Sequence, residues 1–221
     1  MIDELLPAAV SAVEAFGDTA GRSEFPAEEE AIARSTPGRR REFRTVRALA
    51  RTALADLGVA PAPILPGTRG APGWPSGVVG AMTHCAGYRA AAVAHVRQVT
   101  AIGLDAEPNL PLPNQGVWEL VAGPGERASV AALSAHVPHV CWDRLVFSAK
   151  ESTYKAWFPL TGRWLDFDEA EIELRPDGNF VSRLLVPGPV VDGVPLGEFR
   201  GRWMIRRNLL VTAITLVTAG A

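Results

Sequence analysis

The sequence predicts an α+β fold made of two similar units, each a helix-plus-antiparallel-sheet arrangement. First, the chain has 221 residues, enough for one large domain or two of about 110. Second, helical patterns precede strand patterns in each half. Third, the pattern of Asn208–Val217 near the end of the chain resembles that of Tyr88–Val96 in the first half. We therefore expect a pseudo-twofold duplication, with halves at 1–104 and 105–221.

The first half begins with a pattern that predicts a helix over Ile2–Phe16, followed by an acidic loop. Residues Arg34–Arg51 contain seven arginines and one Glu, with apolar residues at helical spacing, and predict an amphipathic helix with a basic face. Prolines and glycines make Pro61–Pro75 an irregular loop. The strands expected after this loop are Val78–Thr83 and Tyr88–Val96, the latter running into Ala101–Asp105.

The second half opens with a proline-rich stretch, Pro108–Pro113, and continues with two helical patterns. The expected helices are Gln115–Ala122 and Asp143–Phe158. Short apolar runs rich in β-branched and aromatic residues then predict strands. These strands are Ala170–Leu174, Phe180–Val186, Gly201–Ile205 and Leu209–Val217.

Composition limits the possible classes of protein. A net charge of −2, with 48 % hydrophobic and 21 % charged residues, is typical of a globular protein and argues against nucleic-acid binding. The longest apolar stretch, Leu209–Ala221, is too short to span a bilayer. Cys85 and Cys141 lack the spacing of a disulfide framework or a zinc site. We expect a cytoplasmic protein without membrane association.

Lysine is rare in this chain: of 22 basic residues only Lys150 and Lys155 are lysines. They lie in one segment, Ser148–Lys155, where Glu151 and Lys155 are four residues apart on one face of a predicted helix. An ordinary ion pair at this spacing would be worth a few tenths of a kcal/mol. However, an arginine would serve such a pair equally well, so the choice of lysine favours a site that needs a compact ammonium.

Two further patterns are candidates for phosphate chemistry. Asp105 and Glu107 end a hydrophobic strand, and their spacing places both carboxylates on one side of it, as a hard cation such as Mg²⁺ requires. Acids at a strand end are also commonly just exposed to solvent, and an exposed acid contributes little to stability. The basic helix and the following segment supply guanidinium and imidazole groups that can bind phosphate oxygens. Those considered are Arg39, Arg40, Arg41, Arg44, Arg47, Arg69 and His84.

Together these segments resemble the 4'-phosphopantetheinyl transferases of the surfactin-synthetase and enterobactin type, over about residues 39–203. Within this family, the resemblance is strongest to actinobacterial enzymes that activate polyketide and nonribosomal peptide synthases. The segments that carry it are Gly103-x-Asp105-x-Glu107, Ser148-x-Lys150-Glu151-x-x-x-Lys155, Arg41-Glu42-Phe43, Pro72-Gly73-Trp74-Pro75 and Thr83-His84-Cys85-Ala86-Gly87-Tyr88. Ala81 departs from the pattern, since many relatives have Ser there.

The resemblance implies that an active site between the halves of a monomer transfers the 4'-phosphopantetheine arm of coenzyme A to a serine of an apo carrier protein, releasing 3',5'-adenosine bisphosphate. The carriers would be free carrier proteins, or carrier domains of polyketide, nonribosomal peptide or fatty-acid synthases. Mg²⁺, with Mn²⁺ as the alternative ion, would be bound by Asp105, Glu107 and Glu151. The catalytic residues would be Glu151 and Lys155. The residues implied to bind coenzyme A are Arg39, Arg47, Arg69, Thr83, His84, Lys150 and Lys155.

Two alternatives remain at the level of the sequence. A metal-dependent phosphohydrolase or nuclease also uses Asp-x-Glu with a later Glu and Lys, but such an enzyme more often has a basic groove for a polymer. A non-catalytic module that binds coenzyme A or a carrier protein would not require a general base.

Overall fold

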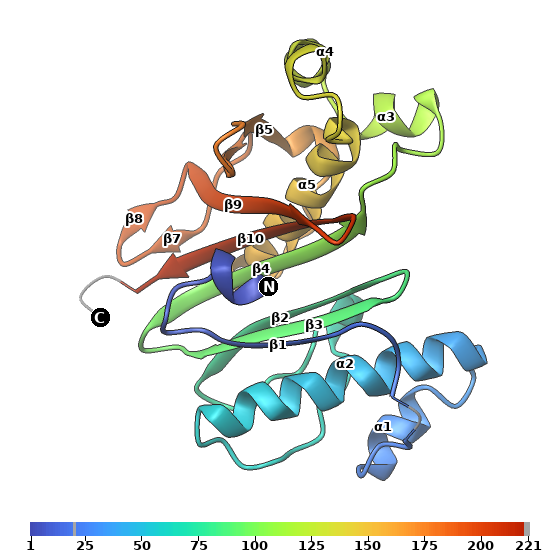
Figure 1. The fold of residues 1–221 in the computed structure, drawn as a ribbon. Coiled ribbons are helices and arrows are strands. Elements are labelled where there is room, and N and C mark those ends of the chain that lie inside the picture. Colours follow the sequence, from blue (N-terminus) through green and yellow to red (C-terminus); the bar gives the residue numbers. More distant parts are fainter. Residues whose placement is uncertain (20, 219–221) are drawn as a thin grey trace.

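The computed structural model describes residues 1–19 and 21–218, arranged in four layers. Helix α2 (Pro37–Asp56) covers an antiparallel sheet of order β1-β3-β2, formed by Ser11–Ala15, Tyr88–His95 and Val78–Cys85. On the other side of this sheet lies a five-stranded sheet, whose outer face is covered by α5 (Trp142–Thr161; Figure 1). Its order is β4 (Val99–Pro108), β10 (Leu209–Val217), β9 (Glu198–Arg206), β6 (Asn179–Leu184) and β5 (Ala170–Leu174).

The remaining elements are short. Three 3-10 helices, η1, η2 and η3, span Ile2–Leu5, Thr68–Gly70 and Phe167–Glu169. The other helices and strands are α1 (Pro26–Ala31), α3 (Gln115–Val121), α4 (Pro124–His136), β7 (Val190–Val191) and β8 (Val194–Pro195). No helix in the described part of the chain is long and apolar enough to cross a membrane.

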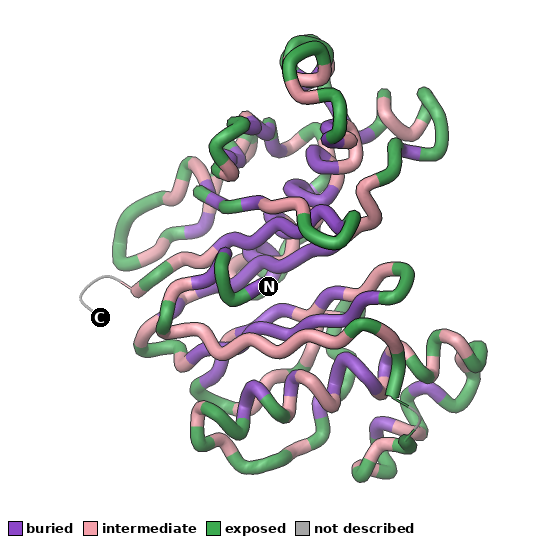
Figure 2. Tube along the Cα trace, viewed as in Figure 1, coloured by how far each residue is buried: buried purple, intermediate pink, exposed green. Residues whose placement is uncertain are grey.

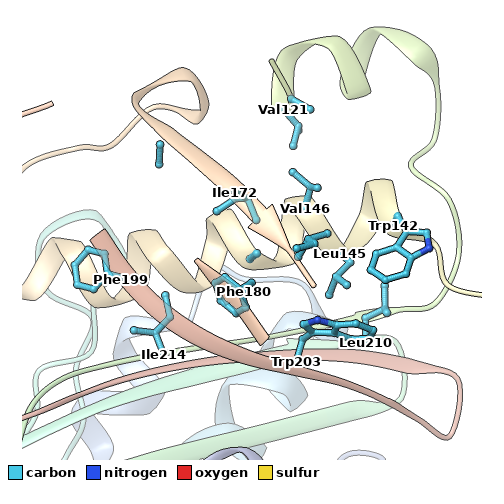
Figure 3. Packing of buried hydrophobic residues seen from close by; sticks show 14 of the residues in the cluster. Val121, Trp142, Leu145, Val146, Ile172, Phe180, Phe199, Trp203, Leu210 and Ile214 are labelled. Carbon is cyan, nitrogen blue, oxygen red and sulfur yellow. The ribbon is translucent and has the colours of Figure 1, made fainter. Parts of the chain in front are cut away.

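Three buried clusters hold the layers together. Figure 2 shows that long buried stretches follow the strands of both sheets. Strand β3 contributes to two of them, because Ala91 and Val93 pack toward α2 whereas Ala90, Ala92 and Ala94 face the second sheet. The small alanine side chains let the two sheets approach closely. The largest cluster lies between α5 and the five-stranded sheet, where the rings of Trp142 and Trp203 meet edge to face at 5.3 Å (Figure 3).

Local sequence explains the two long helices. In α2, Thr36 caps the first turn by accepting a hydrogen bond from the Arg39 amide at 3.3 Å, and Pro37 occupies the first position. Helix α5 ends at Gly162, which adopts a left-handed conformation (φ 64°) that suits glycine. Each helix has 20 residues and crosses an antiparallel sheet of its own half. The predicted α+β fold with a duplicated unit is therefore confirmed.

The prediction of a helix over Ile2–Phe16 is wrong. A 3-10 helix ends at Leu5, and Ser11–Ala15 instead forms strand β1, paired antiparallel with β3. Pairing with a distant strand outweighs the local helical pattern. Helix α4 was missed, although Pro124 and Glu126 at its start are typical helix signals. Part of the predicted acidic loop forms α1.

The remaining predicted helices and strands are present, with bounds shifted by five residues at most. Strand β3 does not run into β4 as expected, because a turn at 96–98 separates them. The division into halves at 104 and 105 stays a prediction. Strand β4 passes through this position without a break, so the residues on both sides of it belong to the five-stranded sheet.

Candidate active site

A cavity of about 650 Å³ lies where the two halves meet, bounded by α2, β2, β4, α5 and the loop around Arg69. One part of its wall carries cations and another carries carboxylates. The predicted site residues that line it are Arg39, Arg47, Arg69, Thr83, His84, Asp105, Glu107, Glu151 and Lys155. The structure therefore brings together nine of the ten predicted residues, from segments more than 100 positions apart.

Asp105 is the most strongly held carboxylate of the cavity. Its Oδ2 accepts a hydrogen bond from the Ser148 hydroxyl at 2.8 Å, and its Oδ1 accepts bonds from Thr83 at 3.3 Å and Lys155 Nζ at 2.7 Å. Only 5 % of the residue is exposed. The expectation of a solvent-exposed acid at the strand end is therefore wrong, because β2 and α5 both pack over this end of β4.

Lys155 pairs with Asp105 across two elements. Its ammonium donates to Asp105 and to the Leu104 carbonyl at 3.0 Å, whereas the simple helical ion pair would have placed it against Glu151. The Glu151 side chain lines the same cavity. Burial raises the pKa of Glu151, opposed by the charge of Lys155 and reinforced by that of Asp105. A carboxyl group of raised pKa in a cavity suits a proton acceptor.

Glu107 completes the group of acids. Its Oε2 accepts a hydrogen bond from Arg144 at 3.0 Å, and Arg144 also donates to the carbonyls of Leu110 and Pro111. Burial raises the pKa of Glu107, and the nearby charge of Asp105 raises it further. This crowding of negative charge, together with the hard oxygen donors, fits a divalent cation. As placed, no three His, Cys, Asp or Glu side chains among residues 1–19 and 21–218 converge closely enough to hold one.

Gly103 brings the acids on β4 and α5 together. A Cβ atom at this position would lie 1.9 Å from the Ser152 carbonyl oxygen of α5. No side chain can fit there unless the helix moves away from the strand. Helix α5 therefore rests directly on the backbone of β4, two residues before Asp105 and next to Glu151.

The cationic part of the cavity comes from α2, β2 and the loop that carries Arg69. Arg47 is buried, donates to the Ile64 carbonyl at 2.6 Å and has its guanidinium carbon 3.2 Å from the centre of the Phe43 ring. Burial lowers the pKa of Arg47 to about 10. Arg39 donates to His84, and Arg69 lies 5.0 Å from the Trp164 ring. These cations fit an anionic ligand with several phosphate groups.

Lys150 does not join the other predicted residues. It lies on another face of α5, is buried and donates to Glu126 at 3.0 Å and to the Phe167 carbonyl at 2.7 Å. It borders a smaller cavity of about 120 Å³ that Glu151 also lines. Burial lowers its pKa, opposed by the charge of Glu126. Lys150 thus forms a buried ion pair with Glu126, and its position gives no direct support to a contact with phosphate.

The prediction from sequence missed two residues that hold the acids, Ser148 and Arg144. Ser148 precedes Glu151 by three residues and Lys155 by seven, the spacing of one helix face, so this signal was available. Arg144 reaches Glu107 only because the loop after β4 folds back onto the start of α5. Nothing local in the sequence indicates that contact.

Comparison with known proteins identifies the family. A profile described as the 4'-phosphopantetheinyl transferase N-terminal domain matches residues 27–94, and one described as the 4'-phosphopantetheinyl transferase superfamily matches residues 101–192. The chain belongs to the 4'-phosphopantetheinyl transferases. It is 54 % identical to 4'-phosphopantetheinyl transferase Svp of Streptomyces mobaraensis, over 98 % of this chain and 89 % of that one.

Two further relatives extend the comparison. This transferase is 48 % identical to 4'-phosphopantetheinyl transferase PptT of Mycobacterium tuberculosis, with 98 % of each chain aligned. It is also 48 % identical to 4'-phosphopantetheinyl transferase Npt of Nocardia iowensis, over 97 % of this chain and 99 % of that one. The chain is thus an enzyme that transfers phosphopantetheine to carrier proteins, with coenzyme A as substrate and a dependence on metal. This result sets aside the phosphohydrolase and binding-module alternatives.

Proposed function

We propose that the cavity binds coenzyme A with its phosphates between the two walls and transfers the 4'-phosphopantetheine arm to a carrier serine, releasing 3',5'-adenosine bisphosphate. One observation carries the proposal: a single cavity has Arg39, Arg47 and His84 on one side and three carboxylates with Lys155 on the other. Guanidinium groups suit the phosphates of the donor. The acids suit the part of the donor where a bond must break.

Asp105, Glu107 and Glu151 would hold a divalent cation, Mg²⁺ or Mn²⁺. The chemistry that such an ion would supply is neutralisation of the negative charge that develops on the pyrophosphate. To bind it, the carboxylates must turn from the partners they have here, which are Lys155 for Asp105 and Arg144 for Glu107. The raised pKa values of Glu107 and Glu151 support this role, because both groups would gain from a nearby positive charge.

Glu151 would take the proton from the carrier serine as the oxygen attacks phosphorus. The bond that breaks joins that phosphorus to the bridging oxygen of the pyrophosphate. Lys155 would then stabilise the departing phosphate, because its ammonium lies in the cavity between the backbone of β4 and Asp105. Lys155 would reach this phosphate by leaving Asp105 to the cation.

Mass spectrometry tests the reaction directly. Incubation with coenzyme A, Mg²⁺ and an apo carrier protein should add about 340 Da to the carrier, the mass of the transferred arm. Glu151→Gln should slow transfer at least about 100-fold, the usual contribution of a general base. Glu30→Gln, which changes an exposed acid on α1, is the matched control and should leave the rate unchanged. A Glu151→Gln variant with parental activity would remove Glu151 from the mechanism.

The same assay tests which classes of carrier protein the enzyme accepts. We propose that carrier domains of polyketide, nonribosomal peptide or fatty-acid synthases are acceptors, and parallel reactions with one carrier of each class rank them. We also propose a cytoplasmic monomer. One chain supplies both walls of the cavity, and Cys85 and Cys141 are free thiols, as in proteins of reducing compartments. Sedimentation of the purified chain tests the monomer.

A further inference from the structure

Glu42 lies behind the cationic wall of the cavity, on α2 one turn after Arg39. Its Oε2 is 3.5 Å from Arg39 Nη1 and 3.7 Å from His84 Nδ1, and its Oε1 is 3.3 Å from Arg89 Nη2. Arg39 and His84 line the cavity in front of it. One carboxylate thus contacts two groups proposed to bind coenzyme A, from two different elements.

One hydrogen bond and one carboxylate contact define how the His84 ring is oriented. A guanidinium group can only donate, so the bond between Arg39 and His84 Nε2 makes Nε2 an acceptor. The proton of the neutral ring is then on Nδ1, the nitrogen that faces Glu42. Glu42 therefore holds the back of the ring, while Nε2 and Arg39 stand together at the cavity wall.

We propose that Glu42 is a positioning residue for the phosphate of coenzyme A: it fixes the His84 ring through Nδ1 and supplies the negative charge that lets Nε2 take a proton when phosphate enters. Protonated His84 and Arg39 would then both donate to phosphate oxygens. This inference rests on the proposed placement of coenzyme A. It adds a role for Glu42, which does not touch the ligand itself.

The charges around His84 show why Glu42 matters. Burial lowers the pKa of His84, and the positive charges of Arg39 on α2, Lys155 on α5 and Arg89 on β3 lower it further. Glu42 is the group that raises it. Without that carboxylate the ring would be neutral at still lower pH, and a neutral ring with Nε2 unprotonated repels phosphate oxygen lone pairs.

The test is the pH dependence of the KM for coenzyme A in Glu42→Gln, which keeps the shape and removes the charge. His84 is charged below its pKa and neutral above it, so a lower pKa moves the rise in KM to lower pH. Near the parental midpoint we expect KM to rise ~3-fold or more, with kcat changed less than ~2-fold. The two proteins should converge well below both midpoints, where the His84 ring is charged in each.

Asp18→Asn is the matched control. Asp18 forms an ion pair with Arg89, with Oδ1 2.9 Å from Nε, and so shares Arg89 with Glu42. Unlike Glu42, it has no ion pair with His84. This variant should keep the parental pH profile. Titration of the His84 ring by NMR gives its pKa independently of turnover, and Glu42→Gln should lower that pKa because the negative charge that raises it is removed.

The outcomes separate the two proposals. If His84→Ala leaves the KM for coenzyme A unchanged, the phosphate placement is wrong, and the role of Glu42 is wrong with it. If His84→Ala raises KM but Glu42→Gln changes neither the pH profile nor the His84 titration, only the inference about Glu42 is overturned. An equal rise in KM at every pH would also overturn it, because that is the result of general structural damage.

Discussion

Replacement of Asp105 should affect stability and catalysis together, contrary to the behaviour of an exposed acid. Asp105→Ala removes the acceptor of hydrogen bonds from Ser148, Lys155 and, at the longer distance of 3.3 Å, Thr83. Hydrogen bonds to a charged group contribute about 1.5–3 kcal/mol each. Lys155 is 26 % exposed and can regain water, which offsets part of the loss. We expect the free energy of unfolding to fall by about 3–5 kcal/mol.

Asp105→Asn separates the two effects. The amide oxygen can still accept one of the hydroxyl hydrogen bonds, whereas the ion pair with Lys155 is lost. We expect this variant to lose roughly half as much stability as Asp105→Ala, in line with the value of the retained bond. Transfer activity should be abolished in both variants, because an amide is a poor ligand for a hard cation compared with a carboxylate.

Urea unfolding followed by circular dichroism gives the stability of each variant, and mass gain on a carrier gives the transfer rate. Both measurements use the same preparations. The transfer rate is measured without urea, at a temperature where all three proteins are folded. A loss below about 1 kcal/mol in Asp105→Ala would contradict the buried network, since surface changes are of that size. Near-parental transfer by Asp105→Asn would remove Asp105 from the metal site.

Three further substitutions test the other walls of the site. Lys155→Arg should lower kcat about 10-fold or more, equivalent to at least about 1.4 kcal/mol, because a guanidinium is too large for the position between Leu104 and Asp105. An unchanged kcat would mean that Lys155 serves only as an ion-pair partner. Arg47→Ala should weaken calorimetric binding of coenzyme A by about 1.5–3 kcal/mol, with a smaller loss for dephospho-coenzyme A; equal losses would mean that Arg47 holds another part of the ligand. Lys150→Met should lower the unfolding free energy by about 3 kcal/mol by leaving Glu126 buried and unpaired, and a large rise in the KM for coenzyme A would instead show contact with substrate.

The sequence predicted most of the residues that line the cavity, but not how their side chains pair. The strand with Asp105 and the helix with Lys155 could both be predicted, because each has a local pattern. The contact between these two side chains depends on helix α5 lying across β4, which is long-range packing. Lys150 shows the opposite case: it belongs to the same sequence motif, yet it turns away into an ion pair with Glu126.

The first half of the chain shows a second limit. Ser11–Ala15 was predicted as helix and forms a strand. Its partner β3 lies more than 70 residues away, so no local pattern indicates the pairing. The position of Glu42 was likewise hidden. It is the one acid among the seven arginines of Arg34–Arg51. Its proximity to His84 follows from α2 crossing the sheet that contains β2.

Gly103 links the packing of the core to the geometry of the reaction. The gap between β4 and α5 is set by backbone meeting backbone at this residue, and the same gap separates Asp105 from Glu151. A methyl group there would widen the spacing of the acids without touching the substrate. A mutational screen for activity would then classify Gly103 as a catalytic residue, and a screen for stability would classify it as a core residue. Under the proposed mechanism, the contact between β4 and α5 at Gly103 sets the distance between Asp105 and Glu151, so we expect a change in packing there to change the rate.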